Sequence, residues 1–323
     1  MSATNKYVNR ERELNTLLKL VELGRHVIIY GLRGIGKTVL LHMLKEKLPN
    51  SILIDCLNIA SPSDLASLLG GKARDGREMF ELLATRGETL LIDEFTVLLD
   101  IASSYGPFKS PLDAARGFRW VLQERSRRGL KPCVLASSAI GLVKKSMSKY
   151  FSPLLRECKL MLLGPLPLDE AAKIALARGV SKEDALKIAE LAAGNPWYTQ
   201  VLTTETIVLG SVEKALVYSL EKGDLNTYFT TLYQFLPPRW RAILHLIARG
   251  NTRFRDIERE MLEDPSIYLN RMLKAGIIGK TKTKEKTHYY ILDPMFKAWL
   301  LSRPKPKLGK TTYEQVKIAA LSF

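Results

Sequence analysis

The first half of the chain alternates between short apolar runs and longer stretches in which apolar residues recur every three or four positions. The short runs are typical of buried strands, and the longer stretches have the spacing of amphipathic helices. The expected strands lie at 26–30, 51–55, 89–93, 132–136 and 159–163. The expected helices lie at 7–23, 39–48, 62–70, 77–86 and 112–128. This alternation predicts an α/β domain built on a parallel sheet.

The pattern changes after residue 164. Gly164-Pro165-Leu166-Pro167 is typical of a boundary, and amphipathic stretches with little strand signal follow it. These stretches lie at about 168–178, 181–193, 196–209 and 211–222. They predict a small helical lid beside the α/β domain.

The last third of the chain has a different layout again. Three helical stretches, at 238–249, 254–262 and 265–275, precede two short strands joined by a lysine-rich turn. Three helices followed by a β-hairpin form the winged helix-turn-helix arrangement. The expected domains are therefore an α/β domain at 1–164, a lid at 165–235, and a winged helix with a basic tail at 236–323.

The turn after the first expected strand carries the strongest chemical signal. It reads Gly-Leu-Arg-Gly-Ile-Gly-Lys-Thr and fits the phosphate-binding loop pattern G-x-x-x-x-G-K-[ST]. A strand before it and a helix after it place free backbone N–H groups and a helix dipole where an anion binds. Lys37 would reach the β- and γ-phosphates of a nucleotide, and the Thr38 hydroxyl would ligate Mg²⁺. The residues expected to line the nucleotide are Gly31, Leu32, Arg33, Gly34, Ile35, Gly36, Lys37, Thr38 and Val39.

A second motif follows some sixty residues later, where the strand Thr89–Asp93 ends in two carboxylates. Asp93 would hold Mg²⁺, and Glu94 would polarise a water molecule for attack on the γ-phosphate. The adjacent glutamate argues against nucleotide kinases, which transfer phosphate to a bound acceptor. A later strand ends in Ser137 and Ser138, and either hydroxyl is a candidate to contact the γ-phosphate because parallel strands end at one crevice.

Charge extends the picture beyond the nucleotide. The net charge is +16, and from residue 230 to the end 18 Lys and Arg stand against 8 Asp and Glu. A basic terminal module favours a polyanionic partner, double-stranded DNA above all, with a lysine-rich solvated surface as the alternative. Winged helices also serve as protein-contact or autoinhibitory modules. The expected DNA contacts are Arg271, Lys274, Lys280, Lys282, Lys284 and Lys286, most of them to phosphates.

Composition also limits the possible classes of protein. No stretch approaches the roughly 20 apolar residues that span a bilayer, and no apolar signal region follows the first residues. We therefore expect a cytoplasmic protein with no membrane partner. Cys56, Cys133 and Cys158 are far apart, which favours reduced core cysteines over a metal site or a disulfide.

Several of these segments together resemble the archaeal ATPase family, in the STAND branch close to AAA+ proteins and alongside the archaeal origin-recognition ATPases. The resemblance covers most of the chain and rests on these segments: Tyr7–Leu14, Gly31–Thr38, Leu91–Phe95, Ser152–Leu154, Gly194–Pro196 and the winged helix.

The resemblance implies a P-loop NTPase with a helical lid and a C-terminal winged helix. It implies that Val8, Asn9 and Arg10 lie near the adenine and that Pro196 contacts the nucleotide and reports its state. Ser137 takes the sensor position. Arg156 is the candidate for the arginine that approaches the γ-phosphate, one residue short of the family's spacing.

The expected function is therefore an ATP-driven switch that hydrolyses ATP to ADP and phosphate with Mg²⁺ and binds DNA. Hydrolysis is expected to be slow, or to need a protein partner or a second copy that completes the site. The alternative is a STAND-type signalling scaffold with a near-permanent nucleotide, whose winged helix contacts protein. A transcription regulator with a decayed ATPase is a third reading, against which the intact Lys37, Thr38, Asp93 and Glu94 argue.

Overall fold

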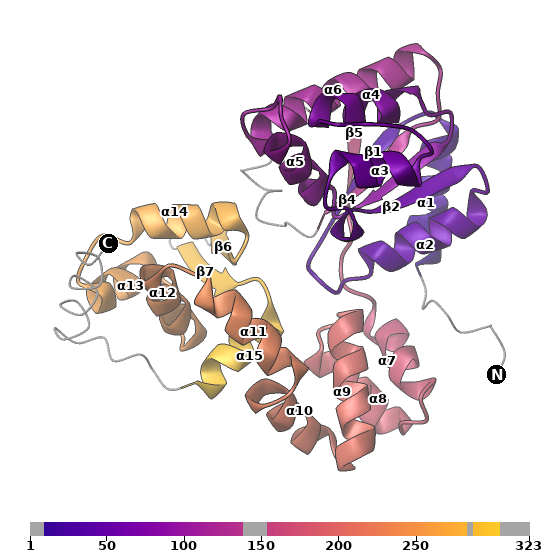
Figure 1. Cartoon of the computed structure of the whole chain (residues 1–323). Helices are drawn as coiled ribbons and strands as arrows, with labels where there is room; N and C mark the ends of the chain where they lie inside the picture. Colours follow the sequence, from indigo (N-terminus) through magenta and orange to yellow (C-terminus); the bar gives the residue numbers. More distant parts are fainter. Residues whose placement is uncertain (1–9, 138–153, 283–286, 304–323) are drawn as a thin grey trace. The chain divides into compact units, whose positions relative to one another are not determined.

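The computed structural model describes residues 10–137, 154–282 and 287–303. The chain forms two compact units, Met1–Gly164 and Pro165–Phe323 (Figure 1). No helix among the described residues is both long and apolar enough to cross a bilayer.

The first unit contains a five-stranded parallel sheet, as the sequence predicts. The strands are β1 (His26–Tyr30), β2 (Ser51–Asp55), β3 (Thr89–Asp93), β4 (Cys133–Ser137) and β5 (Cys158–Leu162). Their order across the sheet is β2-β3-β4-β1-β5, and every neighbouring pair is parallel. Strand β4 therefore lies between the two strands that carry the predicted motifs, β1 and β3.

Helices cover both faces of this sheet because successive side chains of a strand point to opposite sides. Val27 and Ile29 pack with the helices α1 (Glu11–Glu22) and α2 (Lys37–Lys47), whereas Ile28 between them packs on the other side. That other side is covered by α3 (Pro62–Leu68), α4 (Gly76–Thr85), α5 (Phe95–Ser104) and α6 (Pro111–Arg127) (Figure 1). A short 3-10 turn, Cys56–Asn58, follows β2.

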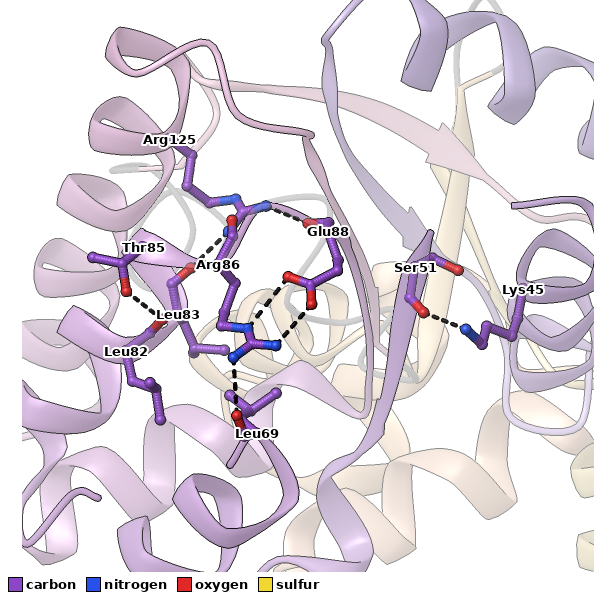
Figure 2. A network of polar contacts seen from close by, with 9 residues as sticks. All are labelled: Lys45, Ser51, Leu69, Leu82, Leu83, Thr85, Arg86, Glu88 and Arg125. Atoms are coloured by element: carbon purple, nitrogen blue, oxygen red, sulfur yellow. Dashed lines mark hydrogen bonds and ion pairs between the residues drawn. The ribbon is translucent and has the colours of Figure 1, made fainter. Parts of the chain in front are cut away.

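At the amino-terminal edge of the sheet, side chains donate hydrogen bonds to main-chain carbonyl oxygens. Arg125 on α6 is fully buried, and its five N–H donors all bond to carbonyl oxygens at 2.5–3.1 Å. The acceptors belong to the end of α4 and to the residues that lead into β3 and β4: Leu83, Arg86, Glu88 and Lys131. Figure 2 shows this arrangement, with Arg86 gripping the Glu88 carboxylate and Lys45 bonded to the Ser51 carbonyl.

His26 completes that edge at the start of β1. Its Nδ1 accepts the Cys133 N–H at 2.9 Å, so Nε2 carries the proton and donates to the Leu122 carbonyl at 3.0 Å. Burial lowers the pKa of His26 to about 4. The imidazole is therefore neutral and joins β1, β4 and α6.

The second unit begins with helices. They are α7 (Leu168–Leu176), α8 (Lys182–Leu191), α9 (Pro196–Leu209), α10 (Val212–Glu221) and α11 (Asp224–Gln234). Ser181, Asn195 and Ser211 cap α8, α9 and α10 by accepting backbone N–H groups.

The remainder of the second unit contains the expected three helices and hairpin. The helices are α12 (Pro238–Ala248), α13 (Phe254–Met261) and α14 (Ser266–Ala275). The antiparallel strands β6 (Ile278–Lys282) and β7 (Thr287–Ile291) follow, and Arg253 adds a bridge to His288 on β7. A last described helix, α15 (Pro294–Ser302), packs against α10, α11, α12 and β7. The division of this unit into a lid and a winged-helix domain stays a prediction.

Candidate nucleotide-binding site

The predicted motifs meet at the carboxyl edge of the sheet. Strand β1 ends at Tyr30, which pairs with Ser137 at the end of β4, and β3 ends at Asp93 on the other side of β4. The loop from Gly31 to Gly36 leaves β1 at this edge and leads into α2. The sheet order thus brings the loop, Ser137 and Asp93 to one crevice.

Two glycines of the loop are required for different reasons. Gly36, which immediately precedes α2, has φ +99°, a conformation that L side chains rarely adopt. A Cβ on Gly31 would lie 2.4 Å from the Leu163 carbonyl oxygen, so a side chain there would push β1 from the end of β5. Ile35, 1% exposed, anchors the loop in the core between them. The buried Ile35 side chain therefore fixes the loop to the core, and the two glycines allow its backbone to turn.

Lys37 lies folded over the loop it follows. Its Nζ donates to the Gly31 carbonyl at 3.1 Å and to the Leu32 carbonyl at 2.9 Å. Burial lowers the pKa of Lys37 to about 8, although Glu94 and Asp93 act in the opposite direction. A phosphate would offer this ammonium the charge-assisted partner that carbonyl dipoles only partly replace.

Thr38 and Asp93 are in direct contact. The Thr38 hydroxyl donates to Asp93 Oδ2 at 2.6 Å, and the Glu94 N–H donates to Oδ1 at 3.0 Å. Burial raises the pKa of Asp93. A hydroxyl and a carboxylate that converge in this way are hard oxygen donors of the kind Mg²⁺ takes, with water and phosphate oxygens as its other ligands. The residues present therefore fit a magnesium ion.

Glu94 has an unusual backbone. It lies between β3 and α5 with φ 45° and ψ 48°, the left-handed region that costs a non-glycine residue about 1–2 kcal/mol. Strain of this kind is typical of functional positions, where the surrounding structure imposes it. The turn places the partly exposed Glu94 directly after Asp93, close enough to Lys37 for their charges to interact.

Arg10 also belongs to this neighbourhood, by contacts that the sequence did not predict. Its guanidinium donates to the carbonyls of Ile35 in the loop and Gly164 at the end of the unit, both at 2.8 Å, and to Glu13 at 2.7 Å. The side chain is 3% exposed. Arg10 therefore ties the start of α1 to the phosphate loop and to the last residue of the first unit.

The structure does not bring Arg156 to this group. Arg156 lies in the exposed turn before β5, whose first residue Cys158 pairs with His26 at the start of β1. The loop follows the opposite end of β1, after Tyr30. Because a strand rises about 3.3 Å per residue, most of the strand length separates Arg156 from the loop of its own chain.

The remaining predicted residues have simpler placements. In the loop, Leu32 and Gly34 are partly buried and Arg33 is exposed, and Val39 is partly buried in α2. Pro196 is the first residue of α9, with Asn195 as its cap. Val8, Asn9, Ser138, Lys284 and Lys286 lie outside the described residues.

The candidate DNA contacts form a separate group in the second unit. Arg271 and Lys274 are exposed on α14, and Lys280 and Lys282 are exposed on β6, which packs against α14. The structure thus collects four of the predicted cations on one helix and one adjoining strand.

No protein-family model and no curated protein sequence matches the chain. Solved structures do match. A Walker-type ATPase of Pyrococcus abyssi superimposes with a TM-score of 0.71 at 22% identity, covering 92% of this chain and 97% of that one. The ORC2 protein of Aeropyrum pernix superimposes with 0.59 at 16% identity in its ADPNP–ADP complexes, covering 92% and 96%. Its ADP form superimposes with 0.53 at 15% identity, covering 92% and 96%.

The chain has the α/β fold of a P-loop NTPase. The likeness extends over both units, because each of these superpositions covers 92% of this chain. At identities of this size the likeness establishes the P-loop NTPase fold and leaves the chemistry to the residues of the site itself.

Proposed function

We propose that this P-loop NTPase binds ATP with Mg²⁺ and hydrolyses it to ADP and phosphate. The observation that carries the proposal is the convergence of the phosphate loop, the Thr38–Asp93 pair and Glu94 at one edge of the sheet. The fold shared with a Walker-type ATPase supports it.

Each residue has a distinct role in this proposal. The N–H groups of the loop and of the first turn of α2 cradle the phosphates, and Lys37 leaves its two carbonyl partners to pair with them. Thr38 and Asp93 hold Mg²⁺, which neutralises charge on the β- and γ-phosphates. Glu94 accepts a proton from the attacking water, and Ser137 contacts the γ-phosphate from β4.

The position of Arg156 bears on the rate of hydrolysis. Because it lies at the opposite edge of the sheet from its own loop, we propose that it acts on the nucleotide of another copy. The nucleotide of a single chain then reacts without the charge of Arg156, and hydrolysis by the isolated chain is slow. Val8, Asn9 and Arg10 are proposed near the adenine, and Pro196 as a reporter of nucleotide state.

We further propose that α14 and the β6–β7 hairpin act as a winged helix that binds double-stranded DNA, mostly through phosphates. The exposed Arg271, Lys274, Lys280 and Lys282 support this function. The competing proposal is a STAND-type scaffold that keeps its nucleotide and uses the same hairpin for protein contacts.

Two variants test the nucleotide site. Lys37→Ala should lose ATP binding in a direct titration, because the loop loses the side-chain cation that is proposed to pair with the phosphates. Glu94→Gln should bind ATP with Mg²⁺ as the wild type does and release phosphate at least about a hundredfold more slowly. Wild-type ATP affinity in Lys37→Ala would contradict the loop assignment, and unchanged turnover in Glu94→Gln would remove Glu94 from the mechanism.

A salt titration tests the DNA proposal. Duplex DNA should bind at 50 mM salt and weaken steeply by 200 mM, with a slope that reports the number of phosphates neutralised. Replacing both Lys280 and Lys282 by Ala should lower affinity and reduce the slope by about two. The matched control replaces the exposed lid lysines Lys182 and Lys222 and should change neither. Absence of binding at low salt would favour the scaffold.

A further inference from the structure

One peptide group of the phosphate loop is held by a side chain from outside the loop. Arg10 Nη2 donates to the Ile35 carbonyl at 2.8 Å, and this carbonyl belongs to the peptide that joins Ile35 to Gly36. A Cβ added to Gly36 would lie 4.0 Å from Arg10 Nε, so the guanidinium also packs beside the Gly36 backbone. Because the peptide is trans, its C=O and N–H point in opposite directions. The Gly36 N–H therefore points away from Arg10.

The peptides on either side of this one are fixed by other bonds. The Ile35 N–H donates to the Leu32 carbonyl at 3.3 Å, and the Gly36 carbonyl accepts the Leu40 N–H at 3.0 Å at the start of α2. The buried Ile35 side chain adds a further anchor. The peptide between them can still turn over as a unit, because glycine adopts positive and negative φ about equally readily. The bond from Arg10 favours one of these two orientations.

The Arg10 guanidinium is itself held in place by three acceptors. Nη2 also donates to the Gly164 carbonyl at 2.8 Å, and Nη1 donates to the Glu13 carboxylate at 2.7 Å. The start of α1, the loop and the last residue of the first unit thus hold one planar head group. Glu13 offsets its charge, and the side chain is 3% exposed. These contacts favour a role in orienting the loop over direct contact with a bound anion.

The orientation of the Gly36 N–H matters because this residue immediately precedes α2. N–H groups at the start of a helix bind anions when they point at them. If the peptide turned over, it would present the Ile35 carbonyl oxygen where the N–H had been, and the oxygen would repel a phosphate. A donor that is oriented before the anion arrives costs no reorganisation when the anion binds.

We infer that Arg10 is a positioning residue for the phosphate loop, which holds the Ile35–Gly36 peptide so that the Gly36 N–H faces the phosphates of the nucleotide. This role rests on the proposed function, since a phosphate must occupy the loop. It goes beyond the proposed place of Arg10 near the adenine, because a contact with the adenine would act on the base alone. A residue that orients the loop affects every ligand that carries the same phosphates, whatever base is attached.

The test compares the binding of three ligands to the full chain with Mg²⁺: ATP, GTP and inorganic tripolyphosphate. Arg10→Lys keeps the positive charge but loses the planar group that reaches two carbonyls and a carboxylate. It should weaken the binding of all three ligands by the same factor, about tenfold or more, as expected for one hydrogen bond to a charged group. Weaker binding of ATP with wild-type affinity for tripolyphosphate would overturn the inference, because that result indicates a contact with the adenine.

A second variant separates this role from a general loss of structure. Thermal unfolding of Arg10→Ala without ligand reports how much of the protein is folded, and affinities are compared per folded molecule. Added guanidinium at low millimolar concentration should restore part of the tripolyphosphate affinity, because it can occupy the space of the missing head group. A folded Arg10→Ala that binds tripolyphosphate with wild-type affinity would show that Arg10 is needed only for folding or not at all.

The matched control is Arg12→Lys. Arg12 lies two residues further along and is exposed on α1, so this variant should bind all three ligands as the wild type does. Equal losses in Arg12→Lys and Arg10→Lys would overturn the inference. If the wild type binds all three ligands and Arg10→Lys binds them equally well, the role of Arg10 fails and the proposed function stands. If the wild type binds neither ATP nor tripolyphosphate, the proposed phosphate site fails and the role of Arg10 falls with it.

Discussion

Charged and polar side chains are buried at both edges of the parallel sheet, but the two edges differ in how these side chains are hydrogen-bonded. At the amino-terminal edge Arg125 is 0% exposed, yet each of its N–H donors has a carbonyl partner, and neutral His26 is bonded through both ring nitrogens. At the carboxyl edge Lys37 and Asp93 are each 4% exposed. Burial lowers the pKa of Lys37 and raises the pKa of Asp93, which in each case favours the neutral form.

This difference separates side chains that the fold itself satisfies from the side chains of the proposed nucleotide site. At the amino-terminal edge, Arg125 and His26 find their hydrogen-bond partners within the chain itself. The carboxyl edge carries a left-handed glutamate, a glycine at φ +99° and an ammonium held only by carbonyls. Destabilised and strained groups of this kind are characteristic of functional sites, where a bound ligand supplies the missing interactions.

The largest effect is expected at the amino-terminal edge. Arg125→Met should lower the free energy of unfolding by about 3–5 kcal/mol, because four main-chain carbonyls lose the donors of this buried guanidinium together. Denaturant unfolding measures this. Arg127→Met is the control on the same helix: Arg127 is 71% exposed, and its solvent-screened ion pair with Glu124 should contribute little to stability. Equal losses in the two variants would show that the buried network adds nothing to stability.

Acid should weaken the same edge. Because the pKa of His26 is lowered to about 4 in the folded chain from an ordinary value near 6.5, the unfolded chain binds the extra proton first as pH falls. The contribution is complete above about pH 6.5 and is lost toward pH 4, a change of about 3 kcal/mol. Unfolding titrations across this window should show a shallower pH dependence in His26→Asn than in the exposed-site control His42→Gln. Parallel curves would contradict the buried neutral imidazole.

At the carboxyl edge, removal of a buried charge should raise the free energy of unfolding instead of lowering it. Lys37→Met removes a buried ammonium whose pKa is lowered to about 8 and keeps most of its apolar stem. The nucleotide-free chain should gain about 1–2 kcal/mol in free energy of unfolding while losing ATP binding. Thermal unfolding together with an ATP titration measures both quantities. A loss of stability would mean that the bonds to Gly31 and Leu32 outweigh the burial of charge.

Patterning accounts for much of the fold, and its omissions have physical causes. Helix α5 was not predicted because it follows β3 after a single residue, Glu94, so that no polar segment separates the strand from the helix. Helix α11 likewise follows α10 after a short turn and was not predicted. Helix α15 was missed although Asp293 before Pro294 is a cap signal that would have found it.

The candidate site likewise contains features that the sequence predicted and contacts that it did not. The spacing of Gly31, Gly36, Lys37 and Thr38 predicted a loop between a strand and a helix, and the structure has that loop. The contacts of Arg10 with Ile35 and Gly164 were not predictable, because residue 164 is distant in sequence and offers only a carbonyl. Arg125 and Tyr198 carry no motif at all.

The amino-acid sequence by itself predicted most of the local structures and the loop between β1 and α2, because hydrophobic periodicity and glycine placement act between near neighbours. Only the tertiary structure decided that β4 separates β1 from β3, that Arg156 lies at the far edge from its own loop, and that Tyr198 meets Asp293. Those outcomes depend on which strands pair and which buried donors find acceptors. These pairings join residues far apart in the sequence, and local residue patterns do not predict them.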